Sequence, residues 1–398
     1  MPRAALASAV CAALAMTAAP ATGAERVRLV FEVAAPAATP AEAVLWLAGN
    51  DAALGGWNPS GVRLTPLGGG RHVAAVEVER GAALEFKVTR GSWETVEKGP
   101  AGEEIANRTH RAERDDTVRV AVAAWRDQTA AAAPPRRSTV TGDVRRHDRF
   151  ASVHVRPRDV LVWLPPGYEA DRARRYPVLY VHDGNNVLDE ATSFAGEWRL
   201  DETAGRMIAE GVLAPFIAVC VYNTPDRMFE YTPVRDAAGR GGGGPAYARF
   251  LIEELKPFVD RVYRTRRGPR DTGLLGSSLG GLISLAIAME RPDVFGLVGC
   301  VSPAAWWADR DLVRRAASAP RSLRVWVDIG TEESTPSAGR RAWLEDTRAL
   351  VASLRSAGLS PDALAYEEVE GGRHHEAAWA ARLDRILTFL IGPPRSRR

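Results

Sequence analysis

The residues best suited to chemistry in this chain form a G-x-S-x-G motif at positions 276–280, with Ser278 at its centre. Apolar residues 273–275 precede the motif, and the apolar stretch 281–289 follows it. This order predicts a strand, a sharp turn and a helix, which would expose the Ser278 hydroxyl at the tip of the turn as a nucleophile. The N-terminus of the following helix would favour negative charge that develops beside the serine. The motif is short, so its interpretation depends on partner residues.

The general base that a serine nucleophile needs is predicted downstream, behind a pair of glycines. The apolar stretch 363–369 predicts a strand, and Gly371-Gly372 then leads to His374 and His375. A histidine on a loop that follows a strand lies where an α/β sheet builds its site. We therefore predict His374 as the base, with His375 as the alternative.

The acid that orients the base is predicted on the loop after another strand, residues 323–329. Gly330-Thr331 follows this strand and leads to Glu332 and Glu333. We predict Glu333 as the acid, with Glu332 as the alternative. Asp328 would lie too deep in the sheet if the strand runs to Ile329. The resulting chain order of serine, acid and histidine is the one found in α/β-hydrolases.

A tetrahedral intermediate also needs two backbone N–H groups that stabilise its oxyanion. We predict that they belong to Leu279, directly after the serine, and to Asn185, on the loop His182-Asp183-Gly184-Asn185. Gly184 would let the backbone approach closely. His182 and Asp183 either hold this turn or contribute to the site. Arg227, on a later loop, either packs that loop against the site or binds substrate.

Alternating strands and helices are predicted to position these residues. The predicted strands span 159–164, 177–182, 216–222, 272–276, 296–302, 323–329 and 363–369. The predicted helices span 201–210, 246–262, 279–289 and 343–357. This alternation predicts an α/β domain at residues 139–394, with a mostly parallel sheet and helices on both faces.

The chain before this domain has a different pattern. Short stretches of alternating hydrophobicity, separated by Gly, Pro and Asn, occur at 27–33, 43–47, 73–78, 84–88 and 117–122. They predict a small all-β, immunoglobulin-like sandwich domain at residues 25–127. The Ala/Pro-rich segment 128–138 has no apolar periodicity and predicts a linker.

Residues 1–24 have an early arginine, an alanine-rich apolar stretch and small residues near Ala24, which predicts a signal peptide and a secreted or periplasmic protein. No other stretch is long and apolar enough to cross a membrane. The formal net charge of +3 is nearly balanced for 398 residues, and it does not indicate a nucleic-acid partner.

The cysteines of the remaining chain, Cys220 and Cys300, lie inside apolar stretches and are predicted to be buried thiols. A disulfide is chemically allowed in an oxidising compartment, but in the hydrolase strand order their strands would not be neighbours. No Cys or His spacing is typical of a metal site, so we predict neither a metal nor a cofactor.

From about Ser138 to Ile391 the chain resembles the putative-esterase family, the esterase D-like or enterochelin-esterase-like α/β-hydrolases. The matching motifs are Leu164 to Tyr168, His182 to Asn186, Arg227 with Glu230-Tyr231, Gly276 to Gly281, Ser302-Pro303 with Trp306-Trp307, Gly330 to Glu333, and His374 with Glu376 to Trp379. The resemblance implies a triad of Ser278, Glu333 and His374, although many relatives carry Asp at the acid position.

The resemblance implies only a broad substrate class. Relatives include siderophore, feruloyl and acetyl esterases, thioesterases and acyltransferases. The expected substrate is a small-molecule or carbohydrate-linked ester, and Trp306 and Trp307 would suit an aromatic or sugar-bearing group.

The N-terminal region resembles a starch-binding domain of carbohydrate-binding module family 20. The matching pieces are Ala48 to Asn50, Leu54 to Pro59, Phe86 to Val88, Trp93-Glu94 and Asn107-Arg108, while residues 99–105 depart from the pattern. The resemblance implies a polysaccharide site made by Trp57, Lys87 and Trp93, in which the aromatic rings stack on a sugar. The alternatives are a sandwich that only braces the esterase, and a non-catalytic carbohydrate-binding protein.

Overall fold

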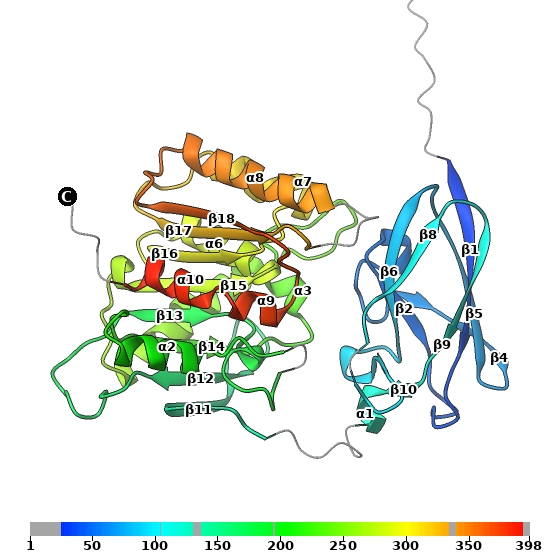
Figure 1. Cartoon of the computed structure of the whole chain (residues 1–398), viewed down its shortest axis with the longest axis horizontal. Coiled ribbons are helices and arrows are strands. Elements are labelled where there is room, and N and C mark those ends of the chain that lie inside the picture. The colour runs from blue at the N-terminus through cyan, green and yellow to red at the C-terminus, as the bar shows by residue number, and fades with distance from the viewer. Residues whose placement is uncertain (1–24, 104, 130–136, 194–195, 334–339, 393–398) are drawn as a thin grey trace, which may run out of the picture. The chain divides into compact units, whose positions relative to one another are not determined.

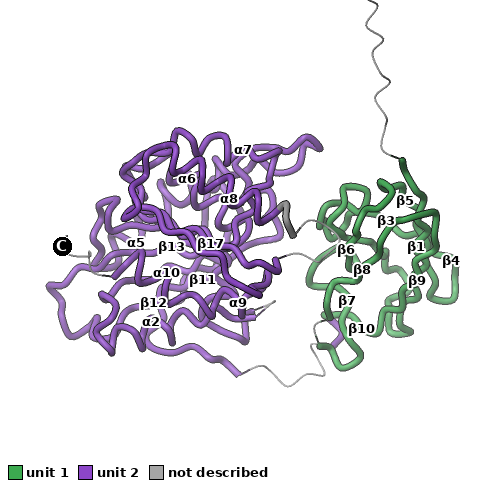
Figure 2. The backbone as a smooth tube through the Cα atoms, turned by 45° about the horizontal axis from the view of Figure 1, so that its top comes forward, with its two compact units in different colours: residues 1–126 green, residues 127–398 purple. Residues whose placement is uncertain are grey.

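A computed structural model describes residues 25–103, 105–129, 137–193, 196–333 and 340–392 and divides the chain into two compact units, Met1–Arg126 and Asp127–Arg398 (Figures 1 and 2). The predicted signal peptide lies outside the described residues, as do residues 130–136 of the predicted linker. The start of that linker belongs to a short helix, α1 (Arg126–Thr129). None of the described helices is long and apolar enough to serve as a membrane span.

The first unit is the predicted β-sandwich, built from two four-stranded sheets (Figure 1). One sheet has the order β4 (Thr65–Gly68), β5 (Arg71–Glu79), β1 (Arg26–Ala34) and β9 (Asp116–Ala121). The other has the order β3 (Val62–Arg63), β2 (Trp46–Gly49), β6 (Ala82–Thr89) and β8 (Arg108–Ala112). Alternate residues of β1 are buried, and Phe31 from this strand meets Phe86 of β6 edge to face at 5.1 Å. The alternating pattern of the sequence therefore does build the core between the sheets.

The second unit contains one eight-stranded sheet with the order β11-β12-β14-β13-β15-β16-β17-β18. These strands are β11 (Asp143–Phe150), β12 (Arg158–Leu164), β13 (Val178–Val181), β14 (Ile217–Val221), β15 (Thr272–Ser277), β16 (Leu297–Val301), β17 (Arg324–Gly330) and β18 (Leu364–Val369). β12 runs antiparallel to both of its neighbours, whereas the strands from β14 to β18 are parallel. This is the strand order of the α/β-hydrolase fold, and it confirms the predicted fold class.

Helices cover both faces of this sheet (Figure 1). One face packs against α4 (Gly244–Arg249), α5 (Lys256–Val262), α6 (Leu279–Glu290), α7 (Trp307–Ala316) and α8 (Arg340–Ser356). The other face packs against α2 (Leu200–Ala209) and α10 (Leu383–Leu390). Successive residues of β12 divide between these cores, with Val160 and Val162 in the first and Leu161 and Trp163 in the second. Both faces are apolar, which is why the strands read as continuous hydrophobic stretches.

The predicted helix at 246–262 is not one regular α-helix. Its middle, Phe250–Leu255, adopts the wider π-helical conformation between α4 and α5. Cys220 on β14 and Cys300 on β16 are both buried and free, with β13 and β15 between their strands. The prediction of two buried thiols is confirmed.

Candidate active site

Ser278 occupies the single residue between β15 and α6. Its φ of 57° and ψ of −121° lie in a region that side chains other than glycine rarely adopt, and such strain is typical of functional turns. The Ser278 N–H donates to the Val301 carbonyl at 2.9 Å, and its own carbonyl accepts from the Ala304 N–H at 3.0 Å. A Cβ added to Gly276 would come within 2.7 Å of the Gly280 backbone. Gly276 therefore allows the close turn that holds Ser278.

The loops after β17 and β18 bring an acid and a histidine together. His374 Nδ1 lies 2.5 Å from Glu333 Oε2. The alternatives from the sequence lie elsewhere: Glu332 pairs with Arg373 at 3.4 Å, and His375 Nδ1 accepts a hydrogen bond from the Ala378 N–H. His375 thereby caps the start of α9 (Glu376–Ala380). The geometry selects Glu333 and His374 as the interacting pair.

Two glycines explain how closely these loops approach. The Glu332 N–H donates to the Gly372 carbonyl at 2.8 Å, and the Thr331 N–H donates to the Val369 carbonyl at 2.9 Å. A Cβ on Gly330 would lie 2.2 Å from the Gly372 carbonyl oxygen. Side chains at these positions would force the loops apart, and the Glu333–His374 pair with them.

Glu333 is buried and receives further hydrogen bonds. Its Oε1 accepts from the Ser302 hydroxyl at 2.6 Å and from the Gly330 N–H at 2.7 Å. Burial alone would raise the pKa of Glu333, but the hydrogen bonds from His374, Ser302 and Gly330 outweigh burial and lower it. The carboxylate thus stays ionised, as an orienting acid must.

A second buried carboxylate lies behind Glu333. Asp328 is inside β17, as its position before Ile329 suggested, and Arg382 Nη2 lies 3.1 Å from Asp328 Oδ1 and 3.6 Å from Glu333 Oε1. Burial raises the pKa of Asp328 to about 6, against the opposing charge of Arg382. Arg382 was not predicted, because nothing local in the sequence links it to residues some 50 positions earlier. Its cation compensates two carboxylates that would otherwise repel each other.

The predicted oxyanion donors have free N–H groups. Among the described residues, neither Leu279 nor Asn185 donates a backbone hydrogen bond. Leu279 is the first residue of α6, where N–H groups lack partners within the helix. A Cβ on Gly184 would come within 2.5 Å of the Cys220 backbone, so only glycine lets this loop lie against β14.

His182 and Asp183 hold the loop that carries Asn185. Burial lowers the pKa of His182 to about 4, and its Nδ1 lies 2.9 Å from the Tyr247 hydroxyl. Arg227, in α3 (Arg227–Glu230), binds both oxygens of Asp183 at 2.6 and 2.7 Å. Of the two roles that the sequence left open for Arg227, the structure supports packing of the loop.

The predicted tryptophans differ in their exposure. Trp306 is 41% exposed, whereas Trp307 is only 2% exposed and its indole N–H donates to the Val234 carbonyl. The prediction that Trp307 contacts substrate is therefore not supported. Trp343, which the sequence analysis missed, lies edge to face with Trp306 at 6.0 Å and against His374 at 4.4 Å. An aromatic surface thus runs from solvent to the histidine.

Three carboxyl groups gather where α2 begins. One oxygen each of Glu197, Asp201 and Glu202 lies within 4.8 Å of the others, and no other group of this kind occurs in the part of the chain that the structure describes. Burial, followed by the charge of Glu202, raises the pKa of Glu197 to about 7. Burial also raises the pKa of Asp201 to about 7, against opposing hydrogen bonds from Thr141. Glu197 and Asp201 are therefore partly protonated near neutral pH.

We expect this cluster to make stability depend on pH. The raised pKa values exceed those of unfolded Asp and Glu, about 3.9 and 4.3. The resulting contribution to the free energy of unfolding is complete below about pH 4 and is lost as the pH rises through about 7. Calorimetry of the second unit should measure the fall in melting temperature between about pH 5 and about pH 8. We expect this fall to be about 2–4 °C larger in the wild type than in Asp201→Asn. The exposed control Asp362→Asn should follow the wild type, and parallel curves for all three proteins would contradict the expectation.

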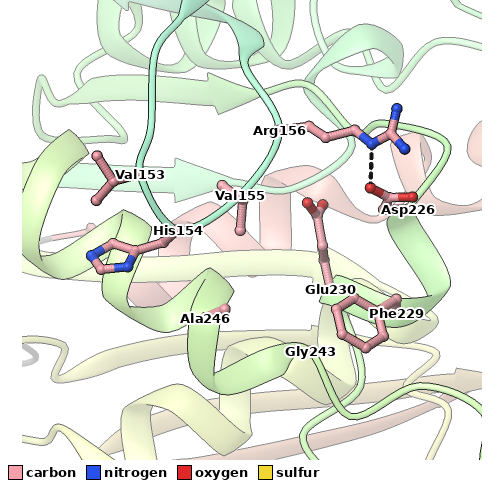
Figure 3. Close-up of a pocket in the computed structure, with 9 residues that line it drawn as sticks. All are labelled: Val153, His154, Val155, Arg156, Asp226, Phe229, Glu230, Gly243 and Ala246. Carbon is pink, nitrogen blue, oxygen red and sulfur yellow. Dashed lines mark hydrogen bonds and ion pairs between the residues drawn. The ribbon is translucent and has the colours of Figure 1, made fainter.

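A surface cavity of about 380 Å³ opens between residues 153–156 and the segment around α3 (Figure 3). Phe229 lines it, and Arg156 Nε lies 2.5 Å from Asp226 Oδ2 at its wall. Ser278, Glu333 and His374 are not among its lining residues. This cavity is therefore distinct from the site around Ser278.

The first unit brings together two of its three predicted sugar-binding residues. The rings of Trp57 and Trp93 lie 6.4 Å apart with their planes at 43°, and Trp93 is 37% exposed. Lys87 is buried instead, and its ammonium group donates to the Ile105 carbonyl. The family resemblance implied a sugar contact for Lys87, but both faces of β6 are largely covered at this end. A sugar contact from Lys87 is not supported.

Comparison with known proteins places the second unit in a family. The model of the family described as "Putative esterase" matches residues 152–390. The chain is 27% identical over 247 residues to "Uncharacterized protein YbbA" of Bacillus subtilis, a match that covers 60% of this chain and 94% of that protein. It is 24% identical over 234 residues to "Endo-1,4-beta-xylanase/feruloyl esterase" of Xylanibacter ruminicola, which covers 58% of this chain and 29% of that protein.

Two further matches cover different shares of the chain. An "Alpha-amylase" of Niallia circulans is 36% identical over 103 residues, 25% of this chain and 8% of that protein. The solved enterobactin esterase FES from Shigella flexneri has a TM-score of 0.51 and 15% identity, and the match covers 87% of each chain. At this identity the structural likeness supports the fold.

Proposed function

Because the chain belongs to the putative-esterase family, whose model covers residues 152–390, we propose that it is a serine esterase that hydrolyses carboxylic esters. The observation that carries this proposal is the 2.5 Å contact between His374 Nδ1 and Glu333 Oε2. Both residues follow strands parallel to β15, and the strained Ser278 directly follows β15, so all three lie at one edge of the sheet.

These positions support the following reaction. Ser278 Oγ attacks the ester carbonyl carbon, and His374 takes the hydroxyl proton through Nε2, the nitrogen that Glu333 leaves free. The Leu279 and Asn185 N–H groups stabilise the oxyanion of the tetrahedral intermediate. His374 then donates the proton to the leaving alcohol, and water hydrolyses the acyl-enzyme by the same steps. Glu333 orients the imidazole and stabilises its positive form. The reaction as written needs no cofactor.

The substrate class that we propose is a carbohydrate-linked acyl, acetyl or feruloyl ester. The exposed Trp306 packs against Trp343, whose ring in turn lies against His374. One relative is named a xylanase and feruloyl esterase. The alternative is a siderophore ester or acyl transfer on the same fold, and another relative is named "Siderophore triacetylfusarinine C esterase" of Aspergillus fumigatus. Export to a periplasm or the medium, which the sequence of residues 1–24 supports, is compatible with either substrate.

A panel of esters tests this function. We expect hydrolysis of p-nitrophenyl acetate, with activity declining toward the octanoate, and hydrolysis of methyl ferulate. Turnover of methyl ferulate but not of a triscatecholate trilactone would favour the carbohydrate-linked class, and the reverse would favour the siderophore class. The absence of all hydrolysis, with retention on polysaccharide, would instead support a non-catalytic binding protein.

For the first unit we propose binding to polysaccharide through Trp57 and Trp93. The two rings form a partly exposed pair, and the match to an amylase has about the length of this unit. Trp93→Ala should weaken retention of the full-length protein on insoluble starch about tenfold. The control Leu67→Ala, which removes an exposed apolar side chain from β4, should retain wild-type binding. If the wild type shows no affinity for starch, cyclodextrin or xylan, the unit only braces the esterase.

A further inference from the structure

Two indole rings hold the imidazole of His374. Trp343, from α8, lies with its ring centroid 4.4 Å from that of His374 and its plane tilted by 40°. Trp379, from α9, meets the same imidazole edge to face at 4.9 Å and 88°. Glu333 contacts the ring at Nδ1. Side chains from three separate segments therefore limit how the imidazole can rotate.

The two indoles are themselves fixed by consecutive residues that follow β16. The Trp343 indole N–H donates to the Pro303 carbonyl at 2.9 Å. The Trp379 indole N–H donates to the Ser302 hydroxyl at 3.1 Å, and that hydroxyl also donates to Glu333. The pair Ser302-Pro303 thus anchors the acid of the triad and both rings around its histidine.

Rotational restraint matters for a group that both accepts and donates a proton. Proton transfer needs Nε2 within hydrogen-bond reach of the serine hydroxyl and then of the leaving group, and small misplacements cost large factors in rate. The face of an indole also attracts the imidazolium that forms when His374 accepts the proton. Of the two indoles, Trp343 lies closer to the imidazole, so its ring both restrains the rotation of His374 and faces the imidazolium when it forms.

We propose that Trp343 and Trp379 form an indole clamp of positioning residues that orients the imidazole of His374 during acyl transfer. This proposal rests on the proposed esterase function. Neither tryptophan needs to touch the ester. Loss of the Trp343 ring should therefore lower kcat and leave KM for a small substrate nearly unchanged.

The test compares an aromatic and a non-aromatic replacement with p-nitrophenyl acetate as the substrate. Trp343→Met should lower kcat about tenfold and change KM less than about twofold, whereas Trp343→Phe should keep kcat within about threefold of the wild type. Trp163→Met is the control, because it removes a buried indole from β12 that packs against Phe216. It should retain wild-type kcat per folded molecule.

A spectroscopic measurement on the wild type does not depend on the folding of any variant. The imidazole carbon-bound protons of His374, assigned by their loss in His374→Gln, should show an upfield ring-current shift from the Trp343 face. An unshifted signal would overturn the clamp.

Other outcomes distinguish failure of the indole clamp from failure of the proposed esterase function. A wild-type kcat in Trp343→Met, or equal losses of kcat in the Met and Phe variants, would overturn the clamp. The esterase function would still be supported in that case if Ser278→Ala were inactive. Full activity in Ser278→Ala would overturn the proposed function and the clamp together.

Discussion

Ser278→Ala is expected to lower hydrolysis of p-nitrophenyl acetate by about four orders of magnitude or more, because it removes the attacking oxygen. The protein should remain folded, since the Ser278 hydroxyl makes no hydrogen bond among the described residues. Alanine also tolerates the positive φ no worse than serine does. Steady-state kinetics, together with circular dichroism to verify folding, measure this effect.

The neighbouring Ser277→Ala provides a matched control. Ser277 is the last residue of β15 and is buried, so its hydroxyl is one residue from the turn but inside the sheet. This variant should retain activity within about threefold of the wild type. Equal losses in the two variants would mean that the turn needs its serines for folding, and would remove the assignment of Ser278 as nucleophile.

His374→Ala is expected to be nearly as damaging as Ser278→Ala, whereas His375→Ala should keep most of the activity. The two residues are adjacent in sequence but have different partners. His374 contacts Glu333, and His375 caps α9 through the Ala378 N–H. Loss of the cap should cost about 0.5–2 kcal/mol of stability without removing the base.

The same kinetics and a thermal melt of both variants check this prediction. His374→Ala should lose nearly all activity per folded molecule, whereas His375→Ala should lower the melting temperature and keep most of the activity. A reversed result would show that the base is the residue one position later, and that the Glu333 contact does not mark the catalytic histidine.

Much of the fold was predictable because its signals are local. The buried parallel strands are continuous apolar stretches, and Gly276 and Gly372 mark turns where the backbone approaches too closely for a side chain. β11 (Asp143–Phe150) escaped prediction because it is an edge strand. Its sequence is mostly charged, as edge strands often are to discourage pairing with other chains. α10 (Leu383–Leu390) spans eight residues, which is short for a periodic signal.

The candidate site also contains residues with local sequence signals and residues without them. Ser278, Glu333 and His374 were predicted as a triad from the motif, the chain order and the family resemblance, whereas the residues that support them make long-range contacts that no local pattern indicates. Arg382 reaches Asp328 across 54 positions of the chain, and Trp343 reaches His374 from a helix that precedes β18. Burial also argues against two of the predicted ligand contacts. Lys87 and Trp307 have side-chain types suited to ligands, but tertiary packing covers both.

The most direct test of Ser278 as the nucleophile is covalent labelling with a fluorophosphonate, followed by mass spectrometry of the digested protein. An activated serine attacks the phosphorus atom, so we expect a single labelled residue, Ser278, and loss of labelling in both Ser278→Ala and His374→Ala. Labelling that persists in Ser278→Ala, or a wild-type protein that hydrolyses esters without becoming labelled at Ser278, would contradict this assignment.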